Sequence, residues 1–296
     1  TSGDTATAVN ENSGVAQVVY TVTANDNVDD VTSEPLSYSL SDDSAGAFSI
    51  DANSGEVTLN ANPDFEAQSE YSFIVVATDT AGNSSDQVVA LSVNNLDEVA
   101  PSITSDDSAS VVENSGAGQV VYTATSVDSA DLSDGVSYSL SGDSDAALNI
   151  DASTGEVTLA ADPDYQVQTS YAFTVIATDD AGNASQQVVT LAVTETVPLA
   201  PSISLVNDSG LFDSDGITSD GEIAVGDLKA GATWEYSVDG GASWTAGIGA
   251  SFELTTPDSY SVAVRQSNTA GTSDHGQLNF VLDQSAPQVD SVEVDT

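Results

Sequence analysis

Acidic side chains with metal-ligand chemistry stand in a short stretch of the sequence, residues 94–101, which reads NNLDEVAP. Asp97 and Glu98 supply two carboxylates there, and a strand-like run at 87–93 leads into them. Ca²⁺ takes six to eight oxygen ligands from carboxylates, carbonyls and water in flexible geometry. The stretch also separates two copies of one repeat. It therefore predicts a joint between domains that a cation neutralises and stiffens.

An internal repeat organises the first two hundred residues. The motif ENSG at 11–14 returns at 113–116, and the run YxFxVxATDxAGN at 71–83 returns at 171–183. Self-similarity of this kind marks tandem structural units. The offset is 102 residues early in the repeat and 100 residues late. A two-residue length change therefore falls in the loop between about 26 and 36, since surface loops tolerate such changes.

Both copies carry the hydrophobic pattern of strands. Tyr71, Phe73, Val75 and Ala77 alternate with residues of the opposite face, which is a period of two. Gly55 lies in SGEVTL, between two short β-rich runs, where a tight hairpin turn is expected. Short strands about every ten residues, with no helical period, predict a β-sandwich of roughly 100 residues.

The pattern changes after residue 200. The stretch ATWEYSVDGGASWT at 232–245 predicts a hairpin in which Trp234 leads one strand and Trp244 returns after the turn. We predict an all-β chain of three tandem β-sandwich domains in an extended rod. The predicted segments are a first repeat at 1–98, a second repeat at 99–199, a third sandwich at 200–285, and a linker or the start of a missing module at 286–296.

The composition excludes several classes of function. The chain has 47 Asp and Glu against 2 Lys and Arg, a formal net charge of −45. Nucleic acid and anionic membranes would be repelled, and no apolar run is long enough to insert into a membrane. The absence of Cys excludes disulfides and thiolate metal sites. A single histidine, His275, and no GxSxG motif leave no catalytic constellation, so we expect no enzyme.

Residues 1–200 resemble bacterial cadherin-like repeats. The resemblance rests on the ENSG motif in both copies, on DFE at 64–66, and on the YxFxVxAxD strand that ends at Asp79 and Asp179. The DxNDNxP linker of that family aligns with residues 95–101. The resemblance implies an extracellular protein of many domains, with calcium bound where two repeats meet.

The resemblance also implies a ligand set. In that family the ligands come from the bottom of one repeat, the linker, and the top of the next, and most of several Ca²⁺ ions are expected at the first of the two junctions. The residues implied there are Glu11, Asp64, Glu66, Asp97, Glu98, Asp128, Asp131 and Asp179. Asp26 and Asp79 hold the corresponding upper positions of the first repeat and would face an upstream neighbour. Val99 stands where the family places an amide ligand.

The second junction has fewer acids. Gln166 replaces the acid found at Glu66, and Pro198 stands where Glu98 stands in the first linker. We expect fewer or weaker ions here, or a differently built site. The candidate ligands are Glu113, Asp164 and Glu195, together with Asp208, Asp213, Asp215 and Asp220 from the third domain.

Residues 200–285 resemble the immunoglobulin-like modules of giant RTX-type bacterial adhesins that leave the cell by type I secretion. The stretches that carry this resemblance are DSGLFDSDGITSDGE and WEYSVDGGASWT. The chain departs from such modules near Asn268, where they often read DxAGN. Trp234 and Trp244 have two interpretations, a sugar-stacking platform or the small core of their own domain.

Most of the acids have a simpler explanation, because an acidic surface keeps a secreted protein soluble. Asp51 and Asp151 precede hairpins and are interpreted as turn residues. With these set aside, the sequence predicts a calcium-rigidified spacer of a bacterial cell-surface adhesin. It would be an extracellular, monomeric rod whose partners are neighbouring domains of the same chain. The alternative is a module that binds a cell-surface glycan or protein through the third domain.

Overall fold

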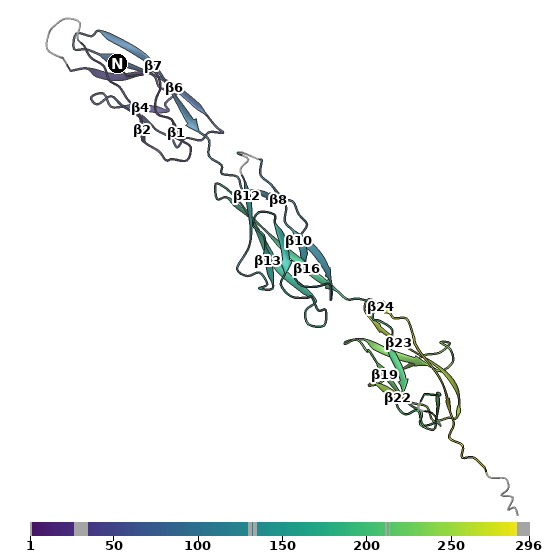
Figure 1. Cartoon of the computed structure of the whole chain (residues 1–296). Coiled ribbons are helices and arrows are strands. Elements are labelled where there is room, and N and C mark those ends of the chain that lie inside the picture. Colours follow the sequence, from purple (N-terminus) through teal and green to yellow (C-terminus); the bar gives the residue numbers. More distant parts are fainter. Residues whose placement is uncertain are drawn as a thin grey trace, which may run out of the picture. The chain divides into compact units, whose positions relative to one another are not determined.

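A computed structural model describes residues 2–26, 35–129, 132, 135–210, 212 and 214–288 (Figure 1). The described residues form strands and turns only, as the all-β prediction requires. Among them no helix has the length and apolar character needed to cross a membrane.

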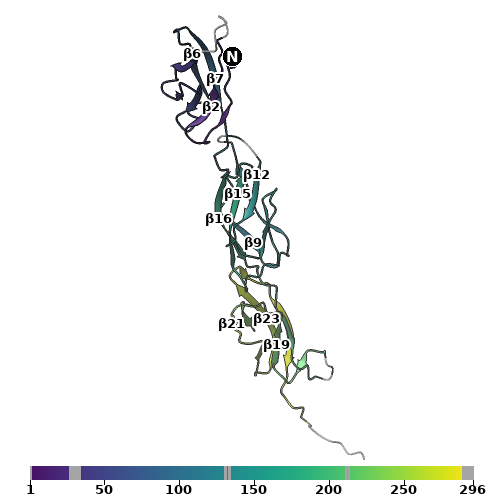
Figure 2. The same cartoon turned by 90° about the vertical axis from the view of Figure 1, so that its left-hand side faces the viewer.

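The first repeat is a sandwich of two sheets (Figure 2). The four-stranded sheet has the order β1-β7-β6-β3, and the three-stranded sheet has the order β2-β5-β4. Phe73 and Val75 on β6 are buried between them with Val89 and Leu91 of β7, which is the face that the alternation at 71–77 predicts. The strand bounds are β1 Val9–Asn10, β2 Gln17–Thr21, β3 Ser37–Asp42, β4 Phe48–Ile50, β5 Glu56–Leu59, β6 Glu70–Thr78 and β7 Ser84–Asn94.

The second repeat has the same topology. One sheet has the order β12-β15-β16-β9, and the other has the order β10-β14-β13, with β8 and β11 forming a separate pair. Gly155 turns β13 into β14 at a φ of +71°, and a Cβ there would lie 2.4 Å from the carbonyl oxygen of Ala124. The strand bounds are β8 Ser102–Ile103, β9 Ser108–Val112, β10 Val120–Thr123, β11 Ser126–Val127, β12 Val136–Leu140, β13 Leu148–Ile150, β14 Glu156–Leu159, β15 Ser170–Asp179 and β16 Ala184–Thr194.

The third domain packs a three-stranded sheet, β17-β19-β22, against a larger sheet built on β18-β25-β23-β20-β21 with β24 beside β23. The predicted hairpin is present, because Tyr236 on β20 pairs with Thr245 on β21. Trp234 is buried in the core, which confirms the core interpretation for that tryptophan. The strand bounds are β17 Ser202–Leu205, β18 Ile217–Thr218, β19 Glu222–Gly226, β20 Thr233–Ser237, β21 Thr245–Ala246, β22 Ser251–Glu253, β23 Asp258–Asn268, β24 Gly271–Thr272 and β25 Gly276–Leu282.

Three separate hydrophobic cores hold these sandwiches. By contacts the chain divides into two units, and residues 128–135 and 179–183 of the second repeat group with residues 1–100 in the first unit. The second unit contains the remainder of the second repeat together with the third domain. We keep 1–98, 99–199 and 200–285 as proposed domain limits. Most of the segment at 286–296 lies outside the described residues.

Candidate metal-binding junctions

Glu11 is the buried centre of the first acidic group. It follows β1 directly and is only 1% exposed. Its Oε2 accepts a hydrogen bond from the backbone N–H of Phe65 at 2.8 Å, and its Oε1 accepts one from Leu96 at 2.6 Å. One carboxylate oxygen each of Glu11, Asp64 and Glu66 lies within 4.8 Å of the others. The turn before β6 and the linker are thus tied to one carboxylate.

A second acidic group contains Asp97, Asp128 and Asp179, whose ligand oxygens also lie within 4.8 Å of one another. Asp97 belongs to the linker, Asp128 follows β11, and Asp179 ends β15. Asn183 donates a hydrogen bond from Nδ2 to the carbonyl oxygen of Asp97 at 2.9 Å. The loop after β15 therefore contacts the linker directly. Among the described residues, these two groups are the ones in which three acids come this close.

Asp179 is held in the charged form by its own loop. Burial acts to raise the pKa of this carboxyl, but hydrogen bonds outweigh it and the pKa is lowered. The donors are Asn183, through its side chain at 3.0 Å and its backbone at 2.8 Å, and the backbone N–H of Gly182 at 2.7 Å. A buried, ionised and oriented carboxylate of this kind is suited to bind a cation.

Asp97 has one carboxylate oxygen bound by the backbone and one buried oxygen that no described residue satisfies. Its Oδ1 accepts a hydrogen bond from the backbone N–H of Val99 at 3.1 Å. Its Oδ2 is buried, and no described residue donates a hydrogen bond to it. A buried carboxylate oxygen without a donor is costly unless a cation or water satisfies it. Glu98 beside it is exposed and accepts a hydrogen bond from Asn12.

The donor set of the first junction fits calcium. All of its candidate ligands are oxygen atoms from carboxylates and linker carbonyls, and hard cations such as Ca²⁺ prefer oxygen ligands. Zinc usually takes nitrogen or sulfur ligands, and neither histidine nor cysteine is present here. Carboxylates at such short separation repel one another unless a counter-charge lies between them. The repulsion makes cation binding at this place favourable.

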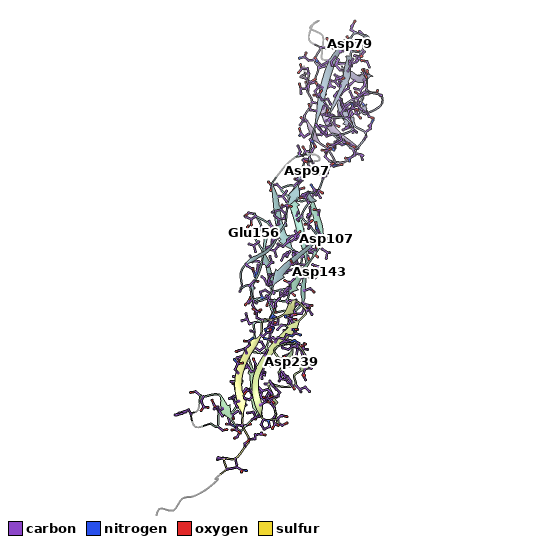
Figure 3. The ribbon with its side chains drawn as sticks, turned by 90° about the vertical axis from the view of Figure 1, so that its right-hand side faces the viewer. Asp79, Asp97, Asp107, Asp143, Glu156 and Asp239 are labelled. Carbon is purple, nitrogen blue, oxygen red and sulfur yellow. The ribbon has the colours of Figure 1, made fainter. Side chains whose placement is uncertain are left out.

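The top of the first repeat holds the predicted upstream candidates. Figure 3 shows Asp79 and Asp97 at opposite ends of this repeat. Asp26 and Asp79 line one shallow pocket together with Asn83. Hydrogen bonds from the side chain and the backbone of Asn83, both at 2.8 Å, lower the pKa of Asp79. Asp79 thus repeats the local arrangement of Asp179, without a linker aspartate beside it among the described residues.

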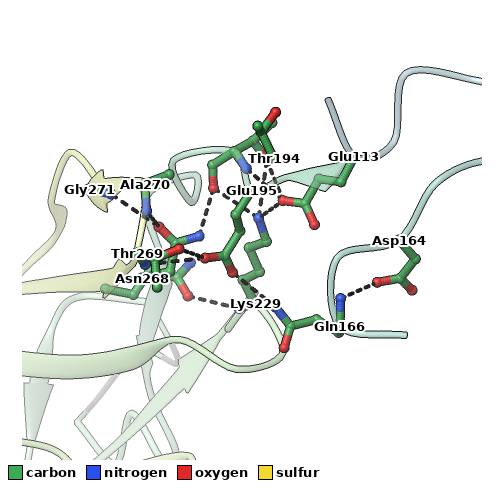
Figure 4. A network of polar contacts seen from close by, with 12 residues as sticks. Glu113, Asp164, Gln166, Thr194, Glu195, Lys229, Asn268, Thr269, Ala270 and Gly271 are labelled. Atoms are coloured by element: carbon green, nitrogen blue, oxygen red, sulfur yellow. Dashed lines mark hydrogen bonds and ion pairs between the residues drawn. The ribbon is translucent and has the colours of Figure 1, made fainter. Parts of the chain in front are cut away.

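The second junction is built from different chemistry (Figure 4). Glu113 is 2% exposed and accepts hydrogen bonds from the backbone N–H of Thr196 at 2.7 Å and from the Lys229 ammonium. Gln166 donates a hydrogen bond from Nε2 to Glu195 at 2.9 Å, and the other Glu195 oxygen accepts one from the hydroxyl of Thr269 at 2.6 Å. The carboxylates here are therefore occupied by donors from the protein.

Asp164 stays on the surface of the second repeat. It is exposed, and its Oδ1 accepts a hydrogen bond from the backbone N–H of Gln166 at 2.8 Å. Unlike Asp64, it is not part of a group of three close acids among the described residues.

The third-domain aspartates require a correction, because they lie far from the second junction. β25 begins beside Pro201, next to the linker, and ends where Leu282 pairs with Thr218 of β18. The loop before β18 is therefore at the other end of the domain. Within this loop the carboxylates accept local hydrogen bonds. Asp208 accepts one from the backbone N–H of Gly216, and Asp215 accepts one from that of Ile217. Asp220 accepts one from the side-chain amide of Asn207. They cannot complete a site at the second linker. Asp213, and Asp131, which was predicted for the first junction, lie outside the described residues.

Lys229 is the functional residue that the sequence reasoning missed. It is the one lysine of the chain and is 116 positions from Glu113 in the sequence. The one signal in the sequence that could have pointed to it is its rarity, because a single lysine stands among 47 acidic residues.

Trp244 is the other tryptophan of the glycan hypothesis. The guanidinium of Arg265 lies 3.9 Å from the centre of its ring, and the ring of His275 stacks against it at a centroid distance of 5.6 Å. Its aromatic surface is engaged within its own domain.

Comparisons with known proteins agree with the tandem sandwiches. The Cadherin domain family matches residues 5–94 and 107–194. Human Protocadherin-23 is 34% identical over 136 residues, which cover 45% of this chain and 4% of that protein. Mouse Cadherin-related family member 1 is 29% identical over 194 residues, 64% of this chain and 22% of that protein. The chain thus corresponds to a small part of each relative.

The solved structure of mouse Cadherin-23 EC22-24 superposes with a TM-score of 0.56 at 17% identity, and the match covers 94% of both chains. This likeness shows the fold, and it extends into the third domain, which the family match does not reach. The architecture is that of tandem cadherin-like β-sandwiches. The chain belongs to the cadherin family, with two cadherin domains in its first two hundred residues. Such domains are extracellular modules of adhesion proteins, and the immunoglobulin-like identity of the third domain remains a prediction.

Proposed function

We propose that this chain is a calcium-stiffened spacer segment of an extracellular adhesin, with calcium bound at the first junction. The observation that carries the proposal is the group formed by Asp97, Asp128 and Asp179. It joins a linker residue to two loops of the next repeat, and the buried Oδ2 of Asp97 has no donor among the described residues. An ion bound there would fix the linker to those loops.

In the proposed mechanism, binding of the ion fixes the conformation of the linker. Without an ion, repulsion among the acids favours separation of the linker from the loops at 128 and 179. With calcium bound, the same carboxylates become ligands, and the linker loses its freedom to bend. Extracellular modules bind calcium with dissociation constants on the order of 10⁻⁴ to 10⁻³ M. Extracellular fluid and seawater would keep such sites filled. Two joined repeats would then act as one stiff element of an extended, monomeric rod.

The setting we propose is the bacterial cell surface, in an RTX-type adhesin exported by type I secretion. Support comes from the sequence, namely the acidic, cysteine-free composition and the resemblance of residues 200–285 to adhesin modules. The relatives named above are mammalian cadherins, and the family match carries the fold and the repeats. Folding on entry into calcium-rich surroundings would suit export as an unfolded chain.

Small-angle scattering and thermal unfolding of the whole chain, with and without EDTA, test the proposal. Calcium should raise the unfolding temperature and narrow the distribution of chain dimensions, and EDTA should reverse both effects. Magnesium makes a matched control, because it demands six ligands at shorter distances and gives up water reluctantly. Magnesium should restore little. If EDTA changes neither dimensions nor unfolding temperature, the spacer is not stiffened by calcium.

A further inference from the structure

The ammonium group of Lys229 lies at the centre of the second junction (Figure 4). It donates to Oε1 of Glu113, to the carbonyl oxygen of Thr196 at 2.9 Å, and to the Thr196 hydroxyl at 3.1 Å. The Glu113 side chain is 1% exposed and the Lys229 side chain 20% exposed. The lysine thus bridges a residue of the second repeat, a linker carbonyl and its own third domain. Those are the kinds of group that calcium would bridge at the first junction.

The second junction also lacks several acids of the first, although Glu113 and Asp164 keep those of Glu11 and Asp64. Four other positions that supply a carboxylate in the first junction supply a neutral group in the second. The pairs are Glu66 and Gln166, Asp97 and Val197, Glu98 and Pro198, and Asp179 and Asn268. The Asn268 Oδ1 accepts from the backbone N–H of Ala270 at 3.0 Å, much as Asp179 accepts from the loop that follows it. The local turn is kept while the charge is removed.

Two carbonyl oxygens of the second linker accept hydrogen bonds from the third domain. Asn268 donates from Nδ2 to the carbonyl oxygen of Thr196 at 2.7 Å. Gln266 donates from Nε2 to the carbonyl oxygen of Leu199 at 2.8 Å. Both donors come from β23 of the third domain. Asp227 and the apolar side chains of Val197 and Pro198 line the same cavity as Lys229. Amide and ammonium hydrogens therefore stand where a metal would need free oxygen ligands.

We propose that the second junction is closed without a metal ion, and that the Lys229 ammonium is the cation that neutralises Glu113 and holds the linker. The inference deepens the proposed function and rests on it for the contrast with the first junction. The chain would then contain one joint whose stiffness depends on external calcium and one whose stiffness does not. Loss of calcium would loosen the joint at 94–101 and leave the second repeat and the third domain together.

The charge state of Glu113 agrees with this arrangement. Burial acts to raise the pKa of its carboxyl, but the hydrogen bonds from Lys229 and Thr196 outweigh it, so the pKa is lowered. The carboxylate is therefore ionised and needs a positive partner. Within the described part of the second junction, Lys229 is the residue that supplies it.

Distance measurements between spin labels on the whole chain can separate the two joints. The chain has no native cysteine, so pairs of cysteines can be introduced without interference. Val88→Cys with Val188→Cys reports on the first joint, and Val188→Cys with Ile248→Cys reports on the second. All three side chains are exposed, at 53%, 65% and 88%. Each pair is measured with calcium and with EDTA, in the otherwise unchanged chain and in Lys229→Met.

EDTA should broaden the distance distribution of the first pair and leave that of the second pair unchanged. Lys229→Met should broaden the second pair both with calcium and with EDTA. Arg265→Met is the matched control, because it removes the other cation from a half-buried pair with Glu235 inside the third domain and should leave the second distribution narrow. The inference is overturned if EDTA broadens the second pair, or if Lys229→Met leaves it narrow. If EDTA leaves the distance distribution of the first pair unchanged, the proposal of calcium at the first junction is wrong, whatever the second pair shows.

Discussion

The two junctions place similar backbone turns beside a buried glutamate and close them in different ways. In the first, Glu11 accepts hydrogen bonds from backbone N–H groups. Further carboxylates lie close together around the linker, and no lysine or arginine of the described residues lies among them. In the second, Glu113 accepts a hydrogen bond from an ammonium group, and four of the positions that are acidic in the first junction are neutral. The comparison teaches that one repeat can serve both a metal-dependent and a metal-independent joint. What differs is whether the positive charge comes from solution or from the chain.

Among the variants that test this difference, Lys229→Met is expected to cause the largest loss of stability. The substitution leaves Glu113 buried without its cation, and breaking a buried ion pair costs roughly 3 kcal/mol. Calorimetry of the whole chain should show this loss in the transition of the second repeat and third domain, with or without calcium.

A double variant controls for the size of the side chain. Lys229→Met combined with Glu113→Gln removes both charges and should recover part of the loss, because no unpaired charge remains. If Lys229→Met costs no more than Arg265→Met, which breaks a half-buried ion pair inside the third domain, the second joint does not depend on the lysine.

The next largest effect is expected on calcium binding at the first junction. Asp179→Asn keeps an oxygen acceptor for the N–H groups of Gly182 and Asn183 but removes a charge from the group at the first junction. Calcium affinity depends on ligand charge, so we expect it to fall on the order of tenfold by titration calorimetry.

Asp79→Asn is the matched variant in the first repeat, where the same turn has no linker aspartate beside it among the described residues. It should change calcium binding less than Asp179→Asn does. Equal losses in the two variants would mean that the group with Asp97 and Asp128 is not the principal site.

The smallest effect is a change in titration. The pKa of Glu113 is below its ordinary value of 4.5, so its stabilising charge is fully present above pH 4.5 and is lost as the pH falls through the lowered value. Carboxyl-carbon NMR should show Glu113 more than half ionised at pH 4.5. In Lys229→Met the effect of burial is no longer offset by the lysine, and the pKa should rise. An unchanged pKa in that variant would show that Lys229 does not stabilise the carboxylate.

The sequence predicted the repeats well, because burial on alternate sides of β6 and β15 leaves a period of two that is visible without a structure. The resemblance to cadherin-like repeats also implied that Glu11, Asp64 and Glu66 are neighbours, and their carboxylates do come together. Reasoning from the sequence did not find Lys229, whose partner lies 116 residues away and in another sandwich. The sequence reasoning placed the loop of Asp208 at the second junction, whereas the loop lies at the other end of the third domain. The parallel pairing of β18 with the end of β25 sets that position, and such a long-range pairing leaves no local sequence pattern.

The central claim is that calcium occupies one junction and not the other, and an amide NMR titration of the unchanged chain with calcium tests it most directly. Residues 95–98, 128 and 179–183 should shift and saturate together. Residues 195–199, 227–229 and 266–271 should keep their positions throughout the titration. Saturable shifts of equal size in the second set would contradict the account, and so would the absence of shifts in the first.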